Sequence, residues 1–159
     1  PEIEVSALRE RAQGARLQEL VRAATVVLDC SDNFATRHAV NRACVEARKP
    51  LVSGAVIRFD GQLSVFDTRQ PDAPCYACLF PENSDFEDVA CSTMGVFAPL
   101  VGVVGAMQAA EAMKLVAGIG EPLAGRLLLL DGRAMEWTTL KVARQPACPV
   151  CEARGGAAQ

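Results

Sequence analysis

Two short cysteine pairs constrain this chain more than any other feature: Cys75 with Cys78, and Cys148 with Cys151. Each C-x-x-C knuckle presents two thiolates from one turn, and together the pairs supply the four soft ligands of a closed tetrahedral zinc site. The alternative is two unrelated redox or free-cysteine pairs, but the spacing favours zinc. Because four thiolates leave no open position for substrate, we expect a structural metal that joins a central loop to the C-terminal end.

The composition indicates one globular domain, which we place at residues 1–159. Half of the residues are hydrophobic and 22% are charged, with a net charge of −3. The sequence has no cluster of Lys and Arg, so we do not expect nucleic acid as a partner. We expect a cytoplasmic protein, because no signal peptide or lipidation motif is visible. The apolar stretch Val96–Val116 is interrupted by polar residues, which indicates a buried helix and not a membrane span.

The first part of the chain predicts a β-α-β unit. We expect a surface helix over Val5–Ala23 and then a strand over Thr25–Cys30 that is covered on both faces, since it lacks polar alternation. The helix Phe34–Arg48 and the strand Leu51–Ala55 follow. Two strands separated by a helix favour parallel pairing, and therefore an α/β fold.

The rest of the chain predicts antiparallel additions to the sheet. Residues Val56–Phe66 are typical of a hairpin with its turn at Asp60-Gly61. The segment Asp67–Met94 contains three prolines and predicts a long functional or partly disordered loop. A long, mostly buried helix is expected over Pro99–Ala117, and a second hairpin over residues 126–142.

A possible ligand site follows the first predicted strand, at Asp32. Ligands bind at the carboxyl edge of open α/β sheets, where a carboxylate can hold Mg²⁺ and order phosphate oxygens. Alternatively, Asp32 and Asn33 only cap the following helix, and position alone favours that reading.

Several separate motifs occur in order along nearly the whole chain. They are Asp29–Arg37, Asn41, Cys44, Gly61-Gln62, Cys75–Cys78, Cys91, Gly95-Val96, Gly102–Gly105, Gln108-Ala109, Glu111-Ala112, Lys114-Leu115 and Cys148–Cys151. In this pattern the chain resembles the MoeB/ThiF family, the adenylyltransferases of molybdopterin and thiamine biosynthesis, which are relatives of ubiquitin-activating enzymes. Residues Ala98–Leu100 and Gly118–Leu123 look more like the molybdopterin branch.

The resemblance implies a Rossmann-like sheet and a homodimer that uses ATP to adenylate the C-terminal glycine of a ubiquitin-like sulfur-carrier protein. Asp32 matches the family's metal and nucleotide aspartate, which favours a catalytic role with Mg²⁺ and ATP over capping. Arg37 and Asn41 are carried over as nucleotide-binding residues, although Arg37 could instead pair with a surface carboxylate.

Of the remaining cysteines and the single histidine, only one cysteine has a possible catalytic role. Cys91 matches the cysteine that, in the thiamine branch, can bond to the activated carrier, and its loop, Pro81–Met94, would cross over the carrier tail. No base or cation beside Cys91 in the sequence supports this catalytic role. Cys30 and Cys44 are interpreted as small buried residues, and His38 as a surface or structural residue.

One departure from the family is important. The chain has no Gly-x-Gly-x-x-Gly turn to cradle phosphates, so we expect the C-terminal portion of an adenylyltransferase, without its N-terminal nucleotide-binding half and inactive alone. Two alternatives are a non-catalytic zinc module that docks a ubiquitin-like protein and a purely structural zinc domain.

Overall fold

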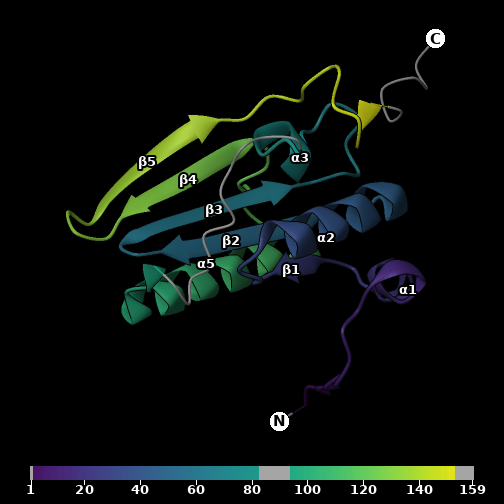
Figure 1. Ribbon diagram of the computed structural model, residues 1–159, viewed down its shortest axis with the longest axis horizontal. Coiled ribbons are helices and arrows are strands. Elements are labelled where there is room, and N and C mark those ends of the chain that lie inside the picture. Colours follow the sequence, from purple (N-terminus) through teal and green to yellow (C-terminus); the bar gives the residue numbers. More distant parts are fainter. Residues whose placement is uncertain (1, 83–93, 153–159) are drawn as a thin grey trace.

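The computed structural model describes residues 2–82 and 94–152, which form a twisted five-stranded sheet with helices on both faces (Figure 1). The strands lie in the order β1 to β5: β1 (Val27–Asp29), β2 (Leu51–Ile57), β3 (Asp60–Phe66), β4 (Arg126–Asp131) and β5 (Glu136–Lys141). The β1–β2 pair is parallel, and the other three pairs are antiparallel. The predicted α/β fold, with a parallel unit continued by antiparallel hairpins, is therefore confirmed.

The helices cover opposite faces of the sheet (Figure 1). They are α1 (Gly14–Ala23), α2 (Phe34–Ala47), α3 (Tyr76–Leu79) and α5 (Ala98–Ala117). Successive side chains of β2 point to opposite faces. Leu51 packs in a core with Cys44 of α2, and Val52 packs in a second core with Ala112 of α5.

Local signals explain where α2 begins and ends. The Asn33 side chain accepts a hydrogen bond from the Thr36 N–H at 2.8 Å, which satisfies one of the free donors of the first turn. Arg48 ends the helix in a left-handed conformation. The residue that caps α2 is therefore Asn33, and Asp32 is not needed for this purpose.

The predicted N-terminal helix is too long. Only Gly14–Ala23 is helical, and the preceding residues extend away with apolar side chains in solvent; Val5, for example, is 87% exposed. The loose apolar spacing from Val5 onward has no surface to pack on among the described residues. Tertiary packing stabilises most helices of this length, so the pattern alone was a poor guide.

Two strand predictions also need correction. The strand β1 has three residues and Leu28 is 40% exposed, so it is not covered on both faces. In the first hairpin, Ile57 pairs with Asp60, which places the turn at Arg58-Phe59 and not at Asp60-Gly61. Gly61 lies inside β3, where an added Cβ would come within 3.1 Å of a Val104 methyl group. Because Gly61 has no side chain, α5 can pack close to β3 at this position.

The long helix α5 is less buried than predicted. By length and composition it could cross a membrane, but Leu100, Val104 and Gln108 are buried on a face that packs against β2 and β3. The opposite face is exposed, including Met113, and Val101 beside the buried face is also exposed. Gly118 ends α5 in the left-handed conformation, and the second hairpin forms as predicted.

Candidate functional site

The four predicted zinc cysteines form one buried cluster, with all four sulfur atoms within 4.8 Å of one another. The Sγ–Sγ distance is 3.9 Å for Cys75 and Cys78, 3.7 Å for Cys75 and Cys148, and 3.5 Å for Cys78 and Cys151. Ligands at the Zn–S length of about 2.3 Å around a tetrahedron are about 3.8 Å apart. The donor set and its spacing therefore fit a metal such as zinc.

The backbone around the first knuckle favours the thiolate form that a metal requires. Cys78 Sγ accepts hydrogen bonds from the backbone N–H groups of Cys75 at 3.5 Å and Gln145 at 3.4 Å. The Cys75 thiol, and then these N–H groups, lower the pKa of Cys78 against the opposing effect of burial, whereas the contact with Cys78 and burial raise the pKa of Cys75, so the first thiolate of this pair forms at Cys78. Charge-stabilising donors of this kind suit a metal ligand, because the thiolate is the form that binds.

Asn41 connects α2 to the first knuckle. It is fully buried, its Oδ1 accepts a hydrogen bond from the Tyr76 N–H at 2.9 Å, and its Nδ2 donates to Cys75 Sγ at 3.7 Å. Asn41 is not among the residues that line the pocket described next. Its expected nucleotide-binding role stays a prediction, whereas its hydrogen bonds join it to Cys75 and Tyr76 of the first knuckle.

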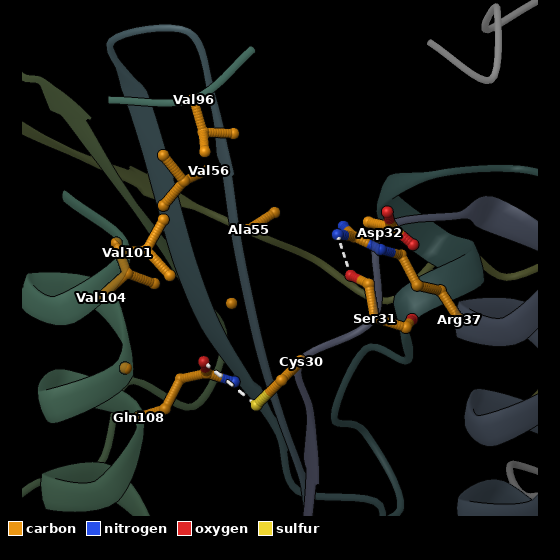
Figure 2. Close-up of a pocket in the computed structure, with 12 residues that line it drawn as sticks. Cys30, Ser31, Asp32, Arg37, Ala55, Val56, Val96, Val101, Val104 and Gln108 are labelled. Carbon is orange, nitrogen blue, oxygen red and sulfur yellow. Dashed lines mark hydrogen bonds between the residues drawn. The ribbon is translucent and has the colours of Figure 1, made fainter. Parts of the chain in front are cut away.

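A pocket of about 330 Å³ opens at the carboxyl end of β1, where the sequence predicted a ligand site (Figure 2). Its lining divides by chemistry. The polar part consists of Cys30, Ser31, Asp32, Arg37 and Gln108, and the rest consists of Gly54, Ala55, Val56, Val96, Val101, Val104 and Gly105. The pocket thus combines one acidic and one basic side chain with an apolar wall.

Asp32 is exposed at the pocket, and no described residue pairs with its carboxylate. The residues before it are held firmly. Asp29 Oδ1 accepts hydrogen bonds from the Ser31 N–H at 2.9 Å and the Ser31 hydroxyl at 2.7 Å. Arg37 Nη2 donates to the Ser31 carbonyl at 2.6 Å (Figure 2). Arg37 is buried against this backbone and forms no ion pair with a carboxylate in the described part of the chain. Asp32 and Arg37 therefore share one site.

The other predicted residues have mixed outcomes. Cys91 lies outside the described residues. Cys44 is buried as predicted, and burial raises its pKa to about 12. Cys30 is exposed at the pocket and not buried, because the short strand β1 ends there. His38 is buried against the Tyr76 ring, with ring centroids 5.3 Å apart, so the structural reading holds.

Sequence reasoning gave no role to Gln108, which is buried beside the pocket. Its signal was visible as a polar residue within the apolar run of α5. A buried amide requires hydrogen-bond partners, so this interruption could have indicated a specific contact.

Comparisons with known proteins identify the family of this chain. The model of the ThiF family matches residues 1–150. The sulfur carrier protein ThiS adenylyltransferase of Escherichia coli is 46% identical over 151 residues, which cover 95% of this chain and 59% of the relative. The molybdopterin-synthase adenylyltransferase of the same organism is 42% identical over 154 residues, covering 95% and 60%.

A third relative and one solved structure extend the comparison. The adenylyltransferase and sulfurtransferase MOCS3 of Drosophila virilis is 40% identical over 156 residues, covering 97% of this chain and 34% of the relative. The crystal structure of E. coli MccB with ATP matches the fold with a TM-score of 0.66 at 20% identity, over 86% of this chain and 43% of that one. The chain spans about three fifths of the length of its two E. coli adenylyltransferase relatives. The family model and these relatives show that this chain belongs to the ThiF family.

Proposed function

We propose that the complete protein uses ATP to adenylate the C-terminal glycine of a ubiquitin-like sulfur-carrier protein. This chain would supply the metal aspartate, the crossing loop, the carrier-facing surface and the zinc centre. The observation that carries the proposal is the carboxylate of Asp32, which no described residue pairs with, at a pocket on the carboxyl edge of the sheet. Relatives that are adenylyltransferases of ThiS and of molybdopterin synthase support the reaction class.

The chemistry explains why a carboxylate would be needed there. The carrier's carboxylate must attack an α-phosphate, so repulsion between two anions is the main obstacle. Mg²⁺ in proteins is held by one or two carboxylates together with substrate phosphates, and Asp32 has a carboxylate available for this. When bound, Mg²⁺ would offset the negative charge of the phosphates. The Arg37 guanidinium adds a fixed positive charge to the same pocket.

The chain would perform only part of this task. The 159-residue sequence contains no Gly-x-Gly-x-x-Gly motif. The backbone N–H groups of such a turn would bind the phosphates. We therefore propose that it is inactive alone. A cytoplasmic location and a homodimeric assembly stay predictions. The two E. coli adenylyltransferase relatives, at 46% and 42% identity, represent both branches, so the choice of carrier is left to experiment.

Asp32→Asn in the full-length protein tests the proposal. We expect carrier-dependent pyrophosphate exchange to fall by orders of magnitude while the melting temperature stays nearly unchanged, because Asn33 and not Asp32 caps α2. Asp72→Asn is the matched control, since Asp72 is exposed and lies outside the pocket.

The alternative function is a non-catalytic docking module. The carrier substrates of both E. coli adenylyltransferase relatives should be assayed with the wild-type protein. An unchanged exchange rate in Asp32→Asn would show that Asp32 does not serve the reaction. No exchange with either carrier, together with ATP-independent binding of one of them, would instead support the docking module.

A further inference from the structure

We propose that Gln108 is a positioning residue that fixes the end of β1 and thereby places Asp32 at the pocket. The inference rests on the proposed adenylation for its effect on rate, but its structural part is testable without ATP. Gln108 lies on α5 and is 3% exposed. Its Nε2 donates to the backbone carbonyls of Asp29 at 3.0 Å and Val52 at 3.4 Å. One side chain thus joins α5 to both parallel strands.

The second polar atom of Gln108 is also engaged. Its Oε1 lies 3.6 Å from Cys30 Sγ, which is in donor range for a thiol (Figure 2). Burying an amide is unfavourable unless its hydrogen bonds are formed, and both ends of this amide have partners. The amide is therefore a specific connection between α5 and β1.

Gly54 makes room for this connection. A Cβ at Gly54 would lie 2.5 Å from both Cδ and Oε1 of Gln108, a distance at which one of them must move. The backbone of Gly54 is not in the left-handed region, so its conformation does not require glycine. The close approach of the Gln108 amide explains the missing side chain.

The connection reaches Asp32 through a short backbone segment. Gln108 holds the Asp29 carbonyl from the α5 side, and Arg37 holds the Ser31 carbonyl from the α2 side. Asp32 follows directly, and no described residue holds its carboxylate. Its position is therefore set by the backbone that these two side chains fix. Misplacing a catalytic group by about 1 Å can cost about 100-fold in rate, so the effect should be measurable.

The first variant is Gln108→Met, which keeps the side-chain length but removes both hydrogen-bonding groups. In the full-length protein we expect the peptide containing residues 28–33 to exchange its backbone hydrogens faster without any nucleotide. We also expect kcat for pyrophosphate exchange to fall at least about tenfold, with a higher Mg²⁺ concentration for half-maximal rate and little change in KM for the carrier. Gln13→Met, at an exposed position, is the matched control.

Gly54→Ala tests the same contact from the other side, including the case in which Gln108→Met does not fold. We expect Gly54→Ala to reproduce the faster hydrogen exchange, because it displaces the amide. In a Gln108→Ala background, Gly54→Ala should cost less stability than in the wild type, because the clash is gone. The double variant should nevertheless still need a higher Mg²⁺ concentration for half-maximal pyrophosphate exchange. If Gln108 only filled space, the exchange rate of the double variant would instead recover together with its stability.

The outcomes separate the two proposals. Unchanged hydrogen exchange over residues 28–33 in folded Gln108→Met and Gly54→Ala would overturn the positioning role, whatever the protein catalyses. Faster hydrogen exchange with an unchanged rate and Mg²⁺ requirement would also overturn it. A wild-type protein that shows no pyrophosphate exchange would refute the proposed function, while the hydrogen-exchange result would still decide whether Gln108 fixes the strand end.

Discussion

Cys148→Ser is the sharpest test of the metal centre. The C-terminal segment returns to the body of the protein at the cysteine cluster, where Cys148 and Cys151 meet the knuckle of Cys75 and Cys78. Apart from the cysteines, few described contacts hold the C-terminal segment, residues 142–152, against the knuckle of Cys75 and Cys78. Val150 packs beside the cluster, and the Gln145 N–H donates to Cys78 Sγ. Removing one thiolate should therefore weaken both the binding of the metal and the attachment of the C-terminal segment.

The size of the effect follows from the loop that the metal closes. Cys75 and Cys148 are 73 residues apart. Treated like a covalent cross-link, closing a loop of this length stabilises the folded chain by about 4 kcal/mol through the entropy of the unfolded state. At roughly 2–4 °C per kcal/mol for a chain of this size, losing the closure lowers the melting temperature by about 8–16 °C.

The assay combines elemental analysis, thermal unfolding and thiol alkylation of the folded protein. We expect one zinc per chain in the wild type and much less in Cys148→Ser. Cys30→Ser is the matched control, since Cys30 is exposed and outside the cluster. The reasoning would be refuted by a Cys148→Ser variant that retains zinc and its melting temperature. It would also be refuted by a metal-free wild type whose four cluster cysteines are alkylated as fast as Cys30.

Two further predictions concern the proposed reaction. Cys91→Ala in the full-length protein should leave carrier adenylation intact, because the carrier's own carboxylate attacks ATP; loss of pyrophosphate exchange with the fold unchanged would give Cys91 or its loop a part in this step. This 159-residue chain should bind ATP poorly by calorimetric titration, because it lacks a glycine-rich phosphate turn, and micromolar Mg²⁺-dependent binding would contradict that expectation.

Some features could be predicted because their signals are local. The C-x-x-C spacing brings two sulfurs to one turn whatever surrounds it, and the structure gathers all four. Asn33 can cap α2 and Gly118 can end α5 because each acts on the adjacent turn of backbone. The family motifs also fixed the expected place of Asp32, at the carboxyl end of β1.

Other features could not be predicted, because they depend on how the helices pack on the sheet. The sequence predicts Gly61 as a turn residue, but the turn is at Arg58-Phe59, and the packing of α5 on β3 explains the glycine. The sequence predicts a buried Cys30, but the sheet leaves it exposed at the pocket.

The sequence by itself determined the α/β class, the cysteine ligands and the ThiF-family motifs, because propensity, capping and ligand spacing act over a few residues. Only the tertiary structure decided that Asn41 contacts the cysteine cluster and that Gln108 joins α5 to β1 and β2. Both are buried amides whose partners are more than 30 residues away in sequence. Their hydrogen bonds exist only after helix and sheet have packed, so a local pattern such as the polar residue within the apolar run of α5 can indicate a buried contact but not its partners.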